Sequence, residues 1–209
     1  MPPTRNSFDR NVFINCPFDR DYYSLLRPLL FTITYLGFNP RIALESSDSG
    51  EMRIEKICTL IKGSKYSVHD LSRLKAARTG EFYRLNMPFE LGIDYGARRL
   101  ASARLRTKRF LILEEGSYNY KRALSDISGV DIKSHSNKPT KIVQAIRNWF
   151  VETVGLTGVE SPTGIWYKFT DFASDFSEHR RVEGFSREDL NMMPIPEYLD
   201  FIRTWISRG

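Results

Sequence analysis

Short apolar segments rich in β-forming residues alternate with amphipathic segments of helical period along most of this chain. The expected strands lie at residues 12–16, 38–44, 65–70, 109–113 and 130–133. The expected helices lie at residues 22–36, 51–62, 87–101, 118–127 and 138–154. Because strands that alternate with helices form parallel sheets covered on both faces, this order predicts an α/β fold. Right-handed crossovers then favour a flavodoxin-like parallel sheet of about five strands, in the order 2-1-3-4-5.

Proline and glycine mark where these elements bend and end. Gly37 is expected to close the first helix, because glycine readily adopts the left-handed conformation of a helix C-terminus. Pro28 is expected to bend or shorten that helix. Pro40 cannot donate to a central ladder, which predicts an edge position for the second strand.

Beyond about residue 155 the chain changes character, with proline and glycine separating aromatic segments. A last helix is expected near residues 195–207. We therefore divide the chain into an α/β domain, residues 1–154, and a C-terminal helical extension, residues 155–209. The extension is expected to pack on the core or on a second subunit.

Composition excludes several classes of protein. The sequence has no run of about 18 apolar residues, so no membrane span is expected. Its first residues lack the apolar region of a signal peptide. Two cysteines, Cys16 and Cys58, do not suffice for a disulfide framework. These features predict a cytoplasmic protein.

The positive charge is unevenly spread along the chain. Residues 1–154 hold 25 Lys/Arg against 16 Asp/Glu, whereas residues 155–209 hold 6 against 9. The densest basic run, residues 98–109, straddles a helix end, where cations complement the helix dipole. Nucleic-acid binding by this run is a weaker interpretation. An anionic small molecule such as a nucleotide fits the charge at least as well.

The segment from Arg84 to Arg98 predicts a helix with an acidic side chain in its first turn. Pro88 suits a first helical turn, and Asn86 or Met87 would then stand at the cap. Glu90 is expected in the same first turn, where the helix dipole stabilises a charged carboxylate. Glu90 is therefore either a catalytic group or a residue that simply complements the dipole.

Several of these polar residues are expected at one edge of the sheet. In open α/β sheets, ligands bind beyond the carboxyl ends of the strands, near the switch in strand order. The predicted catalytic residues at this edge are Glu90 and Asp70. The predicted substrate-binding residues are Asn15, Cys16, Phe18, Arg41, Arg53, Arg73, Arg84 and Asn86. The arginines are candidates for phosphate contacts, although a solvated charge is the more common role. Cys16 is either a nucleophile or, more commonly at such a position, a packing residue.

The motifs of several enzyme classes are missing from the sequence. It contains no G-x-G-x-x-G after the first strand, no phosphate-binding G-x-x-x-x-G-K-[ST] and no G-x-S-x-G. The three histidines lack zinc spacing, so no metal site is predicted, and His69 is interpreted as structural. Cleavage of a C–N glycosidic bond needs little more than a carboxylate beside the anomeric carbon and a second acidic group nearby. Glu90 and Asp70 fit these two roles.

Three segments resemble the nucleoside 2-deoxyribosyltransferase-like branch of the TIR-like superfamily. They are Val12-Phe-Ile-Asn-Cys-Pro-Phe18, Val68-His-Asp70 and Asn86-Met-Pro-Phe-Glu-Leu-Gly-Ile-Asp-Tyr-Gly96, followed by the apolar strand at 109–113. The resemblance covers about residues 11–150. It implies that Glu90 is the nucleophile and that Asp70 lies near the ribose or the base. TIR-domain NADases use a similarly placed glutamate to release nicotinamide from NAD.

The sequence also departs from the transferases. The loop before Glu90 is long and basic, and Cys16-Pro-Phe18 stands where small residues are common. These departures leave room for a phosphate-bearing substrate such as NAD. By analogy with bacterial TIR-like proteins, the resemblance implies a homo-oligomer that acts in antiphage defence.

Two hypotheses of different classes follow. The first is an N-glycosidase that cleaves or cyclises NAD or a related nucleotide, with NAD as substrate, no cofactor and the 71–86 loop closing over the site. The second is a non-catalytic TIR-like module that senses a nucleotide or binds partner proteins.

Overall fold

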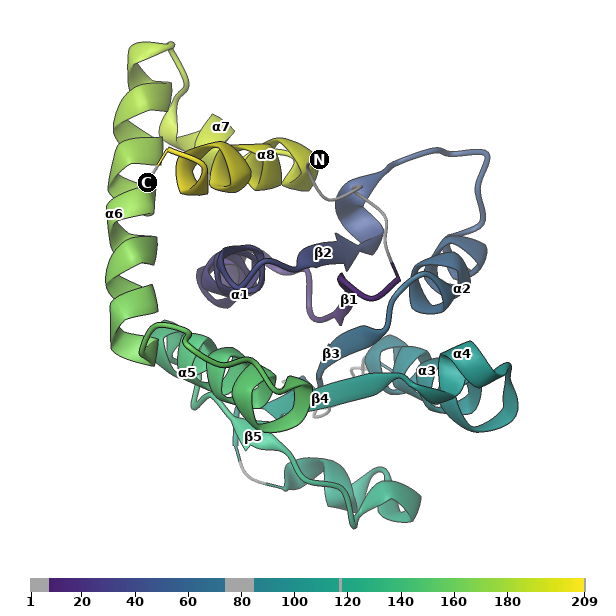
Figure 1. The fold of residues 1–209 in the computed structure, drawn as a ribbon. Helices are drawn as coiled ribbons and strands as arrows, with labels where there is room; N and C mark the ends of the chain where they lie inside the picture. Colours follow the sequence, from purple (N-terminus) through teal and green to yellow (C-terminus); the bar gives the residue numbers. More distant parts are fainter. Residues whose placement is uncertain (1–7, 74–84, 117, 209) are drawn as a thin grey trace.

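The computed structural model describes residues 8–73, 85–116 and 118–208, and it has a five-stranded parallel sheet at its centre (Figure 1). The strands are β1 (Asn11–Asn15), β2 (Asn39–Ile42), β3 (Tyr66–Asp70), β4 (Arg109–Glu114) and β5 (Lys133–Ser134). Their spatial order is β2-β1-β3-β4-β5, and every neighbouring pair is parallel. The predicted α/β flavodoxin-like fold and strand order are therefore confirmed.

Helices cover both faces of the sheet. The α-helices are α1 (Tyr23–Tyr35), α2 (Arg53–Lys62), α3 (Asn86–Leu100), α4 (Ala103–Arg106), α5 (Pro139–Trp149), α6 (Pro162–Val182), α7 (Arg187–Met192) and α8 (Ile195–Ile206). Shorter turns are η1 (Arg20–Tyr22), η2 (Ala43–Glu45), η3 (Asn119–Arg122), η4 (Ser125–Ile127) and the π-helical η5 (Phe150–Val154). Figure 1 shows α1 and α5 on one face, and α2 and α3 on the other. Within the described residues, no helix combines the length and apolarity needed to cross a membrane.

Two of the three predictions made from proline and glycine, those for Gly37 and Pro40, are confirmed. Gly37 follows Leu36, the C-cap residue of α1, and has a φ of 83°, the left-handed conformation that glycine adopts without strain. Pro40 lies on the edge strand β2, as predicted. Pro28 lies inside α1 and does not shorten it, because the helix runs unbroken from Tyr23 to Tyr35, and the predicted bend stays a prediction. One expected helix is wrong, because residues 118–127 form two short 3₁₀ turns around the buried side chain of Tyr120. The last helix of the expected α/β domain is α-helical only to Trp149 and continues as η5.

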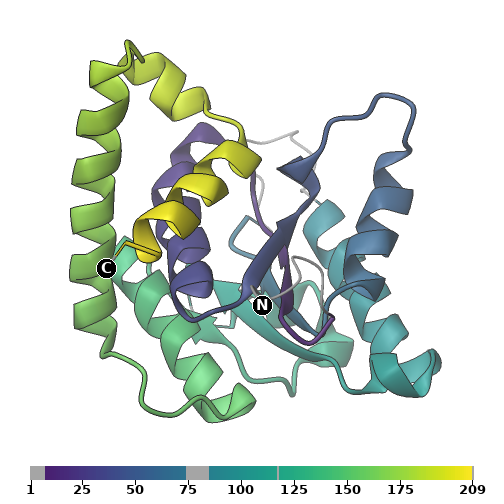
Figure 2. The same cartoon turned by 45° about the horizontal axis from the view of Figure 1, so that its top comes forward.

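The C-terminal helices pack on the α1 face of the sheet, which is one of the two predicted arrangements. Figure 2 shows α6 and α8 lying over α1, on the opposite side of the molecule from α2. Phe31 of α1 joins them, because its ring centroid lies 5.3 Å from that of Phe172 and 5.9 Å from that of Trp205. One hydrophobic core thus runs from the sheet into the extension. The domain boundary at residue 154 and a contact with a second subunit stay predictions.

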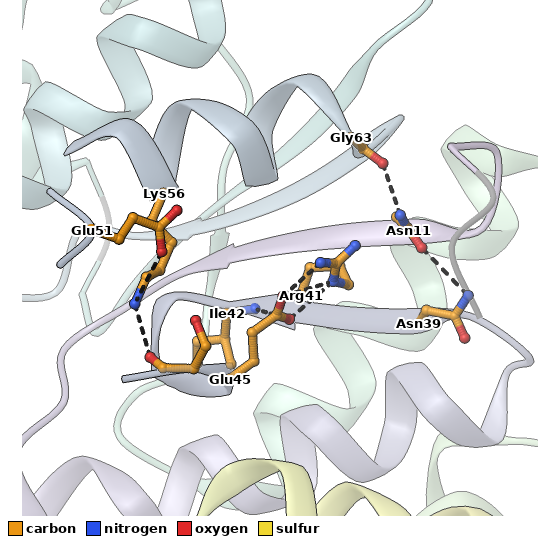
Figure 3. A network of polar contacts seen from close by, with 9 residues as sticks. Asn11, Asn39, Arg41, Ile42, Glu45, Glu51, Lys56 and Gly63 are labelled. Carbon is orange, nitrogen blue, oxygen red and sulfur yellow. Dashed lines mark hydrogen bonds and ion pairs between the residues drawn. The ribbon is translucent and has the colours of Figure 1, made fainter. Parts of the chain in front are cut away.

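Polar contacts hold the edge strand β2 and the amino end of β1 (Figure 3). Arg41 of β2 pairs with Glu45 of η2, with Nε 2.9 Å from Oε2. At the amino end of β1, the side-chain amide of Asn11 donates to the carbonyl oxygen of Gly63 at 2.8 Å. The first contact is local to the edge strand and the turn after it, whereas the second ties β1 to the end of α2.

Candidate functional site

The carboxyl ends of β1 and β3 meet the start of α3, as the strand order predicts. Asn15 at the end of β1 is the register partner of His69 in β3. The Asn15 side-chain amide donates to the carbonyl oxygen of Met87 in the first turn of α3, at 2.8 Å. The segments that were expected to converge therefore do so.

Glu90 lies slightly deeper in α3 than predicted, just beyond the first turn. The helix begins at Asn86, with Leu85 at the cap, so Glu90 is its fifth residue and stands beyond the first turn. The expectation that Asn86 or Met87 caps the helix is therefore wrong, as is the expected place of Glu90 in the first turn. The Glu90 side chain instead faces the interior, and the residue is 6% exposed.

Burial controls the charge of Glu90. Loss of solvation raises its pKa from the ordinary 4.5 to about 7, and the positive charge of Arg53 partly opposes this rise. Arg53 Nη2 lies 4.0 Å from Glu90 Oε1. A carboxyl group with a pKa near neutrality can take part in chemistry in either protonation state.

Arg53 connects Glu90 to the loop after β1. It is the first residue of α2, its side chain is 52% exposed, and its guanidinium carbon lies 5.6 Å from the centre of the Phe18 ring. Arg53 thus lies beside the predicted catalytic carboxylate, and Phe18, another predicted substrate-binding residue, lies beside Arg53. The exposed part of this cation can contact an anionic group that arrives from solvent.

Cys16 lies within the electrostatic reach of both predicted catalytic carboxylates. The residue is buried, and burial, followed by the negative charges of Asp70 and Glu90, raises the pKa of its thiol well above the ordinary value. A thiol must lose its proton to act as a nucleophile. The environment of Cys16 therefore favours the packing interpretation.

Asp70 is fully buried, and protein donors surround both of its carboxylate oxygens. The Tyr22 hydroxyl donates to Oδ2 at 2.5 Å, and His135 Nε2 lies 3.1 Å from the same oxygen. The Ser72 backbone N–H donates to Oδ1 at 2.9 Å, and its hydroxyl donates to that oxygen too. Asp70 thereby ties together the segments that follow β1, β3 and β5.

The His135 ring is oriented by its neighbours. The backbone N–H of Asn137 donates to Nδ1 at 3.1 Å, so the ring proton lies on Nε2, which faces Asp70 and the Ser72 hydroxyl at 2.8 Å. A protonated Nε2 cannot accept the proton of Ser72, so this grouping is not a nucleophilic triad. Sequence reasoning missed His135, although it directly follows a strand that ends at the same edge of the sheet.

A second buried network lies beneath α3. His69 Nε2 lies 3.1 Å from Asp94 Oδ2, and Lys108 Nζ lies 3.2 Å from Asp94 Oδ1, with all three side chains fully buried. Burial alone raises the pKa of Asp94, but the hydrogen bond from His69 and the charge of Lys108 outweigh it and lower the pKa. These contacts support the structural interpretation of His69, and they place Lys108 of the basic run in the core.

The remaining predicted residues lie in different settings. Arg73, after β3, pairs with Asp19 at 3.0 Å and remains 38% exposed. Asn86 is exposed at the start of α3. Arg41 is held by its neighbour on the edge strand. Arg84 and most of the 71–86 loop lie outside the described residues.

A cavity of about 670 Å³ borders another side of α3, between this helix, β4 and residues 123–133. Glu90 is not part of its lining, so the cavity is separate from the predicted catalytic carboxylate. In the part of the chain that the structure describes, no group of three His, Cys, Asp or Glu side chains could hold a metal ion.

No protein-family model matches this chain, and a comparison with curated proteins finds no significant match.

Proposed function

We propose that this protein is an N-glycosidase that cleaves the bond between nicotinamide and ribose in NAD or a related nucleotide. The observation that carries the proposal is the Glu90 carboxyl group, which is buried beside the switch in strand order, has a pKa near 7 and faces Arg53. Ligands of such sheets bind at this edge. The resemblance to TIR-like proteins extends the proposal to a homo-oligomer in antiphage defence.

The reaction requires one well-placed carboxylate. The bond between the ribose C1′ and the pyridinium nitrogen breaks, and its electron pair leaves with nicotinamide, which becomes neutral. The ionised Glu90 carboxylate either attacks C1′ or stabilises the oxocarbenium-like transition state. If Glu90 has attacked, water displaces it and the bond between its oxygen and C1′ breaks, whereas without attack water adds directly to the oxocarbenium ion. In both routes the water loses a proton to solvent, and the product from NAD is ADP-ribose. In cyclisation, a nucleophile of the same nucleotide replaces water.

The setting of Asp70 favours NAD over a deoxynucleoside. A purine base leaves more easily when an acid protonates it. The nicotinamide ring of NAD already carries a positive charge, so it leaves as a neutral molecule and needs no acid. Asp70 is surrounded by the Tyr22, Ser72 and His135 donors, which suits a residue that orders the segments around the ribose. We therefore propose that Asp70, which was predicted to lie near the ribose, acts indirectly by ordering the segments around it.

Phe18, Arg53 and Arg73 supply the binding chemistry that a dinucleotide needs. The exposed part of Arg53 offers a guanidinium for a phosphate, and Phe18 offers an aromatic face for a ring. Arg73 is held by Asp19, so an incoming diphosphate would compete with that carboxylate.

The direct experiment measures nicotinamide release from NAD by the purified protein and by Glu90→Gln. We expect turnover by the wild type and a loss of at least about a hundredfold in the variant, because the group that stabilises the cation is gone. Glu55→Gln, which neutralises an exposed glutamate in the first turn of α2, is the matched control and is expected to match the wild type. Equal turnover by Glu90→Gln and the wild type would refute the role of Glu90.

One observation favours a second candidate, a nucleotide-binding module without catalysis. The Asp70 oxygens bind protein donors, and Glu90 has a cationic partner in Arg53, so both carboxylates have structural roles available. Calorimetry with NAD separates the two candidates. Heat of binding without any nicotinamide release, across a range of protein concentrations, would favour the module.

A further inference from the structure

Asn15 uses both N–H groups of its side-chain amide inside the protein. One donates to the carbonyl oxygen of Met87 at 2.8 Å, and the other faces Nδ1 of His69 at 3.1 Å. A carbonyl oxygen can only accept, so the group that faces Met87 must be the NH₂ and the orientation of the amide is fixed. Asn15 is 2% exposed.

The orientation of this amide sets the direction of the hydrogen bonds behind it. Because Nδ1 of His69 accepts from Asn15, the imidazole carries its proton on Nε2 and donates to Asp94. Asp94 in turn forms an ion pair with Lys108, whose amine donates to the carbonyl oxygen of Ile61 at 2.9 Å. The direction of each bond thus follows from the one next to it.

We propose that this Asn15–Lys108 network, comprising Asn15, His69, Asp94 and Lys108, fixes the first two turns of α3 against the sheet and thereby positions Glu90. The network holds α3 at two points, the Met87 carbonyl before Glu90 and the Asp94 side chain one turn after it. Asn15 and His69 are then positioning residues. The catalytic consequence rests on the proposed function, whereas the bond directions do not.

This role differs from the substrate contact that the sequence predicts for Asn15. A substrate could reach the amide only by displacing two buried hydrogen bonds, which is costly because their partners would be left unsatisfied. Loss of positioning lowers the rate of the chemical step, whereas loss of a substrate contact weakens binding. The two roles therefore separate in kcat and KM.

The kinetic test compares Asn15→Ala with Asn11→Ala in nicotinamide release. Asn11 is a matched control, because it is a buried asparagine of the same strand that donates to a carbonyl oxygen at 2.8 Å, at the opposite end of the sheet (Figure 3). We expect Asn15→Ala to lower kcat roughly ten- to a hundredfold with KM within about twofold. Asn11→Ala should keep both constants within about twofold. A raised KM with unchanged kcat in Asn15→Ala, or unchanged values of both, would overturn the proposal.

A second measurement does not depend on catalysis or on a variant that folds. Long-range ¹H–¹⁵N NMR of the wild-type protein reports which ring nitrogen of His69 carries the proton. We expect the proton on Nε2 and an unprotonated Nδ1. A proton on Nδ1 at neutral pH would overturn the network. If the protein releases no nicotinamide, the proposed function fails, and this measurement still decides the direction of the bonds.

Discussion

Replacing Glu90 by glutamine is expected to stabilise the folded protein at alkaline pH. The pKa of Glu90 is about 7 in the folded state, against an ordinary 4.5, because burial disfavours the charged form. Between these two values the folded state binds more protons than the unfolded state, so stability falls as the pH rises through this window. At about 1.36 kcal/mol per pKa unit, the full cost above pH 7 is roughly 3 kcal/mol. Glutamine resembles the protonated side chain and does not incur this cost.

The assay is urea unfolding of the wild type and Glu90→Gln from pH 4.5 to 8.5. We expect equal free energies of unfolding near pH 4.5 and a variant that is more stable by up to about 3 kcal/mol at pH 8. Glu55→Gln is the control, since Glu55 is exposed, and its difference from the wild type should stay within about 0.5 kcal/mol. A Glu90→Gln difference that does not change with pH, or a variant that is less stable at pH 8, would refute the reasoning.

Three further predictions concern the partners of the buried carboxylates Glu90, Asp94 and Asp70. Arg53→Met should raise the pKa of Glu90 further, because a positive charge near the carboxylate is removed. The rise should be less than about one unit, since Arg53 is half exposed. NMR titration of the carboxyl group measures it, and a fall of the pKa would contradict the prediction. Lys108→Met should lower the free energy of unfolding in urea by about 3–5 kcal/mol, because it leaves the Asp94 charge buried without its cation. A loss below about 1 kcal/mol would contradict the pairing. Tyr22→Phe should lower the free energy of unfolding by about 1–3 kcal/mol, because the buried Asp70 carboxylate loses a donor. Unchanged thermal unfolding would contradict this prediction and show that another donor replaces the hydroxyl.

The fold was predictable because its signals are local. Alternating strand and helix periods determine the sheet order, and Gly37 and Pro40 act through their own backbone chemistry. Residues 118–127 were mispredicted as a helix because a tertiary contact, the burial of Tyr120, decides their conformation. The pairing of Arg41 with Glu45 four residues later was within reach of sequence reasoning, since both residues lie close together in the chain.

The candidate site was predictable in its location but not in its charges. Asn15 and Asp70 are the last residues of two neighbouring parallel strands, so their convergence follows from the sheet order. The partners of Asp70, by contrast, come from distant segments, with Tyr22 48 residues before it. The rise in the pKa of Glu90 depends on how the interior closes around a side chain one turn inside the helix. No local pattern contains that information.

The pH dependence of nicotinamide release tests most directly the claim that Glu90 acts through its carboxylate. Initial rates are measured from pH 5 to 9 at an NAD concentration well below KM, for the wild type and Glu90→Gln. The ionised form of Glu90 is the active one, so kcat/KM should rise about tenfold per pH unit and level off with a midpoint near 7. Glu90→Gln should show a low rate without this rise. A wild-type profile that is flat across this range, or the same rise in Glu90→Gln, would contradict the account.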